Sequence, residues 1–156
     1  MSKLENRTYD EIQVGDKAEV SHSVTERDLI LFAEVSGDIN PVHLDEDFAA
    51  ATPFKGRIAH GMFSGALISA AIACEMPGPG TIYIGQEMSF LRPVRLGDQI
   101  RIELEVIEKL PKNRARIATR VFNQDGKQVV DGVATVMVPT EKVSVERPVL
   151  AKVSIG

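Results

Sequence analysis

The sequence predicts an α+β fold in which one antiparallel sheet wraps around one long central helix. The segment from Gly61 to Met76 is rich in Gly, Ala, Ser and Ile and carries no charge before Glu75, which is typical of a buried helix. The residues from 82 to 138 read as successive strands separated by turn residues. A sheet wrapped around the helix would cover the helix's apolar surface.

The first half of the chain contains two expected strands and a helix. Tyr9 to Asp16 is expected to form a short strand that ends in a Gly-Asp turn, and Ala18 to Val24 a second strand. Thr25 is a favourable N-cap, with Asp28 three residues later as its capping partner. These residues, followed by apolar side chains at helical spacing, predict a helix over Glu26 to Ser36.

Turn-forming residues end this helix and the central one. Gly37 to Pro41 combines Gly, Asp, Asn and Pro, each of which favours a turn for a different physical reason. A short helical turn is expected over Glu46 to Ala51. Pro77 to Gly80 ends the central helix sharply.

The second half of the chain reads as four strands. Turns are expected at Pro111 to Asn113 and at Asn123 to Gly126, and the latter is a strong hairpin signal. The expected strands are Ile82–Leu91, Gln99–Glu108, Arg116–Phe122 and Val129–Val138.

Length and composition predict a single domain of 156 residues, with a core over about 9–139 and a C-terminal tail over 140–156. The tail either packs on a partner or is loose. Net charge is −4 and the Lys and Arg residues are scattered, so no nucleic-acid partner is expected. No secretory signal and no membrane span are expected, and the single Cys74 cannot form an internal disulfide. We therefore expect a cytoplasmic protein.

The most informative chemistry lies between residues 36 and 45. Asp38 and His43 are five residues apart across a turn stiffened by Pro41. Such a turn can bring a carboxylate and an imidazole together around one water, with one group as proton acceptor and the other as donor. The alternative is that Asp38 is an ordinary turn residue and His43 a structural histidine.

Three residues of the central helix could take part in the same site. Gly61 lies where backbone N–H groups lack helical partners, so it could bind a thioester oxygen as that oxygen becomes an enolate, or it could serve helix packing alone. Ser69 could hydrogen-bond to Asp38 or to a carbonyl one turn back. Ile72, three residues further on, either limits an acyl chain or is ordinary core.

Metal binding is not expected from the spacing of the potential ligands. The candidates are His22, His43, His60 and Cys74, and their spacing matches no compact zinc pattern.

The pattern Asp38-x-Asn40-Pro41-x-His43, with Asp45 and His60-Gly61-Met62, resembles the hydratase-2 motif of MaoC-like (R)-specific enoyl-CoA hydratases. More narrowly, the chain is similar to the short bacterial PhaJ-type enzymes that feed polyhydroxyalkanoate synthesis. The resemblance runs from about Tyr9 to Pro139 and shows no departure at the motif positions.

The resemblance implies a hotdog fold and a homodimer with active sites at the subunit interface. It implies Asp38 and His43 as a catalytic dyad, the Gly61 N–H as oxyanion donor, Ser69 as a support for Asp38, and Asn40 as a brace of the motif loop. The implied reaction is syn addition of water to a trans-2-enoyl-CoA, giving the (R)-3-hydroxyacyl-CoA. No cofactor is expected, because coenzyme A is part of the substrate, and a short acyl chain is expected.

Three other functions remain open at this point. A 3-hydroxyacyl-ACP dehydratase would use the same chemistry on acyl carrier protein. A thioesterase of this fold would place an acid on the central helix, which has none before Glu75. A non-catalytic acyl-CoA-binding protein would not need Asp38 and His43 together.

Overall fold

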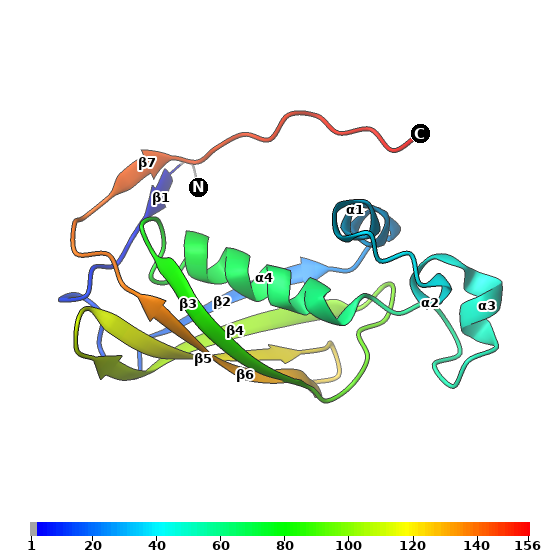
Figure 1. Ribbon diagram of the computed structural model, residues 1–156, viewed down its shortest axis with the longest axis horizontal. Coiled ribbons are helices and arrows are strands. Elements are labelled where there is room, and N and C mark those ends of the chain that lie inside the picture. Colours follow the sequence, from blue (N-terminus) through cyan, green and yellow to red (C-terminus); the bar gives the residue numbers. More distant parts are fainter. Residues whose placement is uncertain (1–2) are drawn as a thin grey trace.

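The computed structural model describes residues 3–156, so residues 1–2 of the expected domain lie outside the described part of the chain. A twisted sheet forms one layer and the long helix α4 lies across it, while three shorter helices gather beyond one end of α4 (Figure 1). In chain order the elements are β1 (Lys3–Glu5), β2 (Lys17–Ser23), α1 (Glu26–Ser36), α2 (Pro41–Leu44), α3 (Glu46–Ala50), α4 (Gly61–Cys74), β3 (Ile82–Phe90), β4 (Gln99–Leu110), β5 (Arg114–Phe122), β6 (Gln128–Met137) and β7 (Ser144–Glu146).

The main sheet has five antiparallel strands in the order β2-β4-β5-β6-β3. The predicted α+β architecture, with an antiparallel sheet around one long helix, is therefore confirmed. All four predicted strands of the second half are present, with ends that differ from the prediction by at most two residues. In residues 3–156, none of the helices combines the length and the apolar character needed to span a bilayer.

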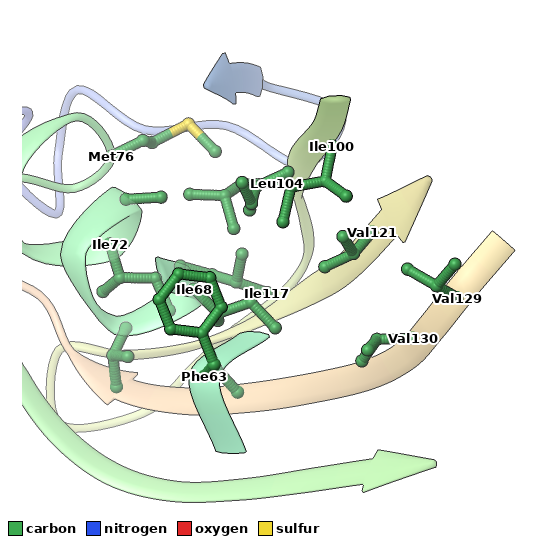
Figure 2. Close-up of a cluster of buried hydrophobic side chains, with 14 of the residues drawn as sticks. Phe63, Ile68, Ile72, Met76, Ile100, Leu104, Ile117, Val121, Val129 and Val130 are labelled. Carbon is green, nitrogen blue, oxygen red and sulfur yellow. The ribbon is translucent and has the colours of Figure 1, made fainter. Parts of the chain in front are cut away.

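The core fills the space between α4 and the sheet. Phe63, Ile68 and Ile72 of α4 pack among buried side chains of the strands (Figure 2). Each such side chain contributes roughly 1.5–3 kcal/mol when it leaves water. The sheet contributes many of the other buried residues, among them Ile100, Leu104, Ile117, Val121, Val129 and Val130.

The opposite face of α4 is not covered by the sheet. Met62 is 58% exposed, and Ala66, Ala70 and Ala73 continue the exposed face at helical spacing. The expectation that the sheet accounts for the all-round apolarity of the helix is therefore wrong, because the sheet covers only one side of α4. An uncharged, exposed helix face is a surface that another element can bury.

The helix α1 begins and ends as its residues predict. Thr25 and Asp28 form a reciprocal capping box, which satisfies backbone N–H groups at the helix start. Gly37 ends the helix with φ of 78°, a left-handed conformation in which glycine avoids a steric cost. Because the chain leaves α1 at Gly37, Asp38 is the first residue after the turn.

Two local expectations were wrong. Residues 9–16 form turns rather than a strand, because Thr8 accepts the backbone N–H groups of Glu11 and Ile12 while its own N–H bonds to the Glu11 carboxylate. The α2 helix was not predicted, because its start uses the same Asn40 and Pro41 that indicate a turn.

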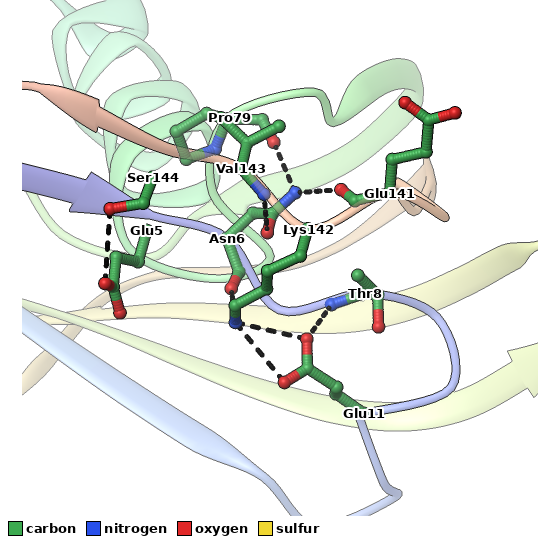
Figure 3. Close-up of polar contacts among 9 residues, drawn as sticks. All are labelled: Glu5, Asn6, Thr8, Glu11, Pro79, Glu141, Lys142, Val143 and Ser144. Carbon is green, nitrogen blue, oxygen red and sulfur yellow. Dashed lines mark hydrogen bonds and ion pairs between the residues drawn. The ribbon is translucent and has the colours of Figure 1, made fainter.

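The C-terminal segment is attached to the N-terminal one. Strand β7 pairs with β1, and the Asn6 side chain bonds to the backbone of Pro79, Glu141 and Val143 (Figure 3). Lys142 bonds to the Asn6 carbonyl and pairs with Glu11 at 3.1 Å. Residues 147–156 have no regular structure and are exposed. The tail is therefore held at its beginning, and its remainder extends over the open side of α4 (Figure 1). Near its end, the Val153 carbonyl accepts a hydrogen bond from the Arg27 side chain of α1 at 2.8 Å.

Candidate active site

Asp38 and His43 face each other at the end of the molecule where α1 and α2 meet α4. The Asp38 Oδ2 and His43 Nε2 atoms are 3.8 Å apart. That separation is too long for a direct hydrogen bond and short enough for one water to contact both atoms. The Asp38 side chain is 48% exposed and that of His43 is 9% exposed, so the pair lies at the boundary between solvent and protein interior.

The contacts of His43 determine which of its nitrogens is free. His43 Nδ1 lies 2.8 Å from the carbonyl oxygen of Ile58, which can only accept, so Nδ1 carries the hydrogen. In the neutral ring Nε2 then presents a lone pair toward Asp38. The His43 carbonyl accepts from the buried Arg57, whose guanidinium also pairs with Glu26 of α1 at 3.0 Å. These contacts connect the His43 backbone to α1.

Local hydrogen bonds hold the loop that carries Asp38. Asp38 Oδ1 accepts from the Asn40 N–H at 3.1 Å. Asn40 in turn caps α2, because its side-chain oxygen accepts from the Val42 N–H at 3.2 Å. With Pro41 at the first position of α2, this arrangement orients the short helix that carries His43.

His60 lies against both members of the pair. Its ring stacks on His43 with centroids 3.9 Å apart and planes inclined by 25°. Its Nε2 donates to the Asp38 carbonyl oxygen at 3.0 Å, and its Nδ1 is buried without a hydrogen-bond partner among residues 3–156. The ring also lies 4.9 Å from that of Phe32 in α1.

Gly61 is the first residue of α4, directly after His60. The His60 side chain does not cap the helix, so the Gly61 N–H points out of the helix end without a capping side chain. The positive end of the helix dipole lies at the same place. A Cβ at Gly61 would lie 3.4 Å from the Phe90 ring of β3, so glycine leaves this corner of the site open.

A cavity of about 340 Å³ joins these groups. His43, His60 and Gly61 contribute to one side, and most of its remaining surface is apolar. A cavity of this size and polarity suits a small ligand with an apolar portion. The other lining residues come from the loop before α4, the start of α4, the segment after β3 and β6: Phe54, Ile58, Ala59, Ser64, Phe90, Leu91, Arg92, Pro93, Val94 and Val130.

The structure does not connect Ser69 with Asp38, and it does not place Ile72 in the lining of the cavity. Within residues 3–156 the Ser69 side chain makes no hydrogen bond, so neither the expected bond to Asp38 nor the alternative bond to a carbonyl is present. Ile72 is 1% exposed and belongs to the core, outside the cavity lining. That core also includes Val94 and Val130, which do line the cavity.

Asp38, His43 and His60 also form a cluster that could be considered for a metal ion, since one potential ligand atom of each lies within 4.8 Å of the others. Imidazole lone pairs lie in the ring plane, and two stacked, nearly parallel rings direct these lone pairs side by side rather than at one point. His60 Nε2 also has its hydrogen committed to the Asp38 carbonyl. The geometry therefore suits a held water better than a coordinated ion.

Sequence reasoning assigned no role to His60, Arg57 or Phe90. His60 was noticed as part of a motif, and a histidine directly before a helix-starting glycine was the available signal. Nothing local in the sequence connects Arg57 with Glu26 or Phe90 with Gly61, because these contacts join residues about thirty positions apart.

Comparison with known proteins identifies the family. A profile of the MaoC like domain matches residues 9–125. The chain is 66% identical to R-hydratase PhaJ1 from Pseudomonas aeruginosa in the unliganded form, with a TM-score of 0.97 over 99% of this chain and 100% of that one. It is 41% identical to the (R)-hydratase from A. caviae involved in PHA biosynthesis, with a TM-score of 0.80 over 82% of this chain and 98% of that one.

A curated relative supports the same assignment. The 3-hydroxybutyryl-CoA dehydratase of Methylorubrum extorquens is 42% identical over 135 residues, which cover 86% of this chain and 85% of that protein. The fold, the residues of the motif and these matches agree, and the chain belongs to the MaoC-like domain family of hotdog-fold proteins.

Proposed function

We propose that this protein is an (R)-specific enoyl-CoA hydratase, which adds water to a trans-2-enoyl-CoA to give the (R)-3-hydroxyacyl-CoA. One observation carries the proposal: His43 and the uncapped N-terminus of α4 border one largely apolar cavity, and the Asp38 carboxylate lies 3.8 Å from the His43 ring. The names of the similar proteins, an R-hydratase and a 3-hydroxybutyryl-CoA dehydratase, describe this reaction in its two directions.

The dyad is suited to hold the attacking water. His43 Nε2 and the Asp38 carboxylate are both acceptors, so each can take one hydrogen bond from the same water. This leaves an oxygen lone pair for attack on C3 of the enoyl thioester. As the C3–O bond forms, one of the two groups takes a proton from the water.

Completion of the reaction requires charge stabilisation and a second proton transfer. Attack on C3 moves the electrons of the C2–C3 double bond toward the thioester oxygen, and the Gly61 N–H is the donor for that oxygen. The dyad then delivers a proton to C2 on the face where the hydroxyl was added. The sum is addition of one water without a change of redox state, so the reaction needs no cofactor.

The same residues argue against the alternatives in different degrees. The helix α4 has no acidic residue, whereas a thioesterase of this fold would need one there. A non-catalytic acyl-CoA-binding protein would not need an aspartate and a histidine held in place by contacts with Asn40, Arg57, Ile58 and His60. A 3-hydroxyacyl-ACP dehydratase shares the site chemistry, and comparison of crotonyl-CoA with crotonyl-ACP as substrates distinguishes the two carriers.

We further propose that the enzyme links fatty-acid β-oxidation to polyhydroxyalkanoate synthesis in the cytoplasm. The 41% identity to a hydratase described as involved in PHA biosynthesis supports the first part. A single cysteine, which is free in the structure, agrees with a reducing compartment. Co-expression with a polyhydroxyalkanoate synthase tests the link to polymer synthesis, because the polymer should then accumulate. Cell fractionation tests the cytoplasmic location.

We propose that the protein is a homodimer joined at β3. This strand is an edge of the sheet, and it exposes Ile82 and Ile84, whereas the other edge strand, β2, exposes Lys17 and Glu19. Charged residues protect an edge from pairing and apolar ones do not. The exposed face of α4 adjoins β3, since Gly65 of α4 lies close to Met88, so a second copy could bury both surfaces.

Substitution of the dyad should abolish most of the activity. We expect wild-type protein to hydrate crotonyl-CoA to (R)-3-hydroxybutyryl-CoA, and Asp38→Asn and His43→Ala each to lower kcat by about 10²–10⁴-fold, because each group transfers or holds a proton. Loss of the enoyl absorbance gives the rate, chiral chromatography gives the product, and circular dichroism checks the fold.

The chain offers a matched control for these variants. His22 and Asp28 form a second His–Asp pair, 2.9 Å apart and outside the cavity. His22→Ala should keep kcat close to that of the wild type. A folded Asp38→Asn variant with full activity would contradict the assignment of the dyad.

Bulk at Gly61 should damage chemistry more than binding. In Gly61→Val the side chain meets the Phe90 ring and displaces the helix start from the thioester oxygen. Loss of one oxyanion donor costs roughly 3 kcal/mol of barrier, or about 10²-fold in kcat. Gly56→Val, at a position where an added Cβ meets only the Glu46 carboxylate at 3.7 Å, is the control and should keep the wild-type kcat. An unchanged kcat with a raised KM would exclude an oxyanion role.

The enzyme should prefer short acyl chains, with Ile72 limiting the depth of the cavity. Ile72 lies in the core that continues the cavity lining, so Ile72→Ala should open space beyond it. Each additional buried methylene gains about 0.8 kcal/mol. The measurement is kcat/KM for octenoyl-CoA relative to crotonyl-CoA. Leu104→Ala, a core variant outside the cavity, is the control. If the octenoyl-to-crotonyl ratio of kcat/KM rises no more in Ile72→Ala than in Leu104→Ala, Ile72 does not limit the acyl chain.

The dimer proposal predicts a response at β3 alone. Wild-type protein should sediment as a dimer at micromolar concentration, and Ile82→Lys should shift it toward monomer, because a charge at the edge opposes pairing. Val14→Lys, which changes another exposed apolar residue, should leave the dimer intact. Sedimentation of the wild type as monomer only would refute the proposal.

A further inference from the structure

His60 contacts each part of the candidate site without being one of the groups that the proposed reaction uses. Its Nε2 holds the Asp38 backbone, its ring covers that of His43, and the next residue is Gly61. It is 3% exposed. Among the described residues, His60 alone combines side-chain contacts to both Asp38 and His43 with a place directly before the start of α4.

The two contacts of His60 restrain different movements. The hydrogen bond from Nε2 to the Asp38 carbonyl, at 3.0 Å, holds the loop that leaves α1 at Gly37. The stacking contact, at 3.9 Å between centroids, restricts rotation of the His43 ring about its side-chain bonds. Because the Asp38 side chain is exposed, solvent alone would not hold it at a fixed distance from His43.

We propose that His60 is a positioning residue, which holds Asp38 and His43 at the separation that binds the attacking water. This inference rests on the proposed hydratase function. A catalytic group displaced by about 1 Å can lose about 10²-fold in rate, so a residue that fixes two such groups has a measurable effect on kcat. His60 does not exchange a proton with the substrate in this scheme.

The unpartnered Nδ1 of His60 indicates that this residue does more than fill space in the protein interior. With its hydrogen on Nε2, neutral His60 buries an Nδ1 lone pair that has no donor within residues 3–156. Such an atom lowers stability, and an apolar aromatic ring would fill the same space without that cost. A residue that is unfavourable for packing and well placed for the dyad is typical of a functional position.

Two substitutions separate the two contacts. His60→Phe keeps a ring over His43 and loses the donor to Asp38. His60→Gln keeps an N–H donor of similar reach and loses the ring. We expect His60→Phe to lower kcat by about 10- to 100-fold with KM within about twofold of the wild type, and His60→Gln to recover part of the lost kcat. Thermal stability of His60→Phe should equal or exceed that of the wild type, because the buried lone pair is removed.

His22→Phe is the matched control, because His22 also lies in a ring contact, with Phe63, and in a hydrogen bond to an aspartate, but outside the cavity. It should keep the wild-type kcat. Nitrogen-15 NMR of the histidine rings provides a readout independent of turnover. We expect neutral His60 to carry its hydrogen on Nε2 and neutral His43 on Nδ1, and the His43 signals to change in His60→Phe but not in His22→Phe.

The outcomes distinguish this inference from the proposed function. Absence of hydration by the wild type, or full activity of Asp38→Asn, overturns the function. An inactive Asp38→Asn together with a His60→Phe variant whose kcat is within threefold of the wild type overturns the positioning role alone. A folded His60→Gln variant no faster than His60→Phe overturns the role of the hydrogen bond. The double variant that combines His60→Phe with Asp38→Asn gives a further check. If its kcat is no lower than that of Asp38→Asn alone, the result supports action of His60 through Asp38.

Discussion

Burial of one face of α4 against the sheet is the constraint on which the rest of the molecule depends. The helix contains no charged residue, so its position is determined by apolar contact, with side chains such as Ile68 and Ile72 inside the core. This contact fixes the axis of α4 and therefore the place of its first residue, Gly61. The cavity and the backbone donor at its edge follow from where this helix begins.

Asp38 and His43 are held near the start of α4 by side chains of the segment that precedes this helix. Asp38 follows the glycine that ends α1, and His43 lies on a helix of four residues whose start is fixed by Asn40 and Pro41. Arg57 and His60 connect these segments across the site, one through the His43 carbonyl and the other through the Asp38 carbonyl. Two backbone carbonyls are thus held by side chains from the segment before α4, which makes the loop part of a rigid arrangement.

Sequence reasoning succeeded where the physical signal was local. The capping box of Thr25 and Asp28 and the uncharged run after Gly61 are each readable within a few residues, and α1 was predicted with the bounds that the structure has. It failed at residues 9–16, where turn hydrogen bonds of the Thr8 backbone, one of them to the Glu11 side chain, outweigh strand-like alternation. The spacing of Asp38 and His43 indicated a dyad, but their actual distance depends on Ile58 and His60, fifteen and seventeen residues beyond His43, and no local pattern reports such contacts. Ser69 was inferred from the need of a polar side chain in an apolar helix for a hydrogen bond and from the family resemblance, and Ile72 from its helical spacing to Ser69. Neither argument tells what lies opposite these side chains.

The unequal exposure of Asp38 and His43 has a consequence for how reactants reach the site. One reactant is water and the other carries an apolar chain, and a single opening would make them compete for the same path. Asp38 lies half in solvent, whereas His43 is covered and borders the apolar cavity. With the acyl chain in the cavity, as the proposed function requires, water would have a separate route along the carboxylate side. In the reverse direction the eliminated water would leave by that route without crossing the thioester.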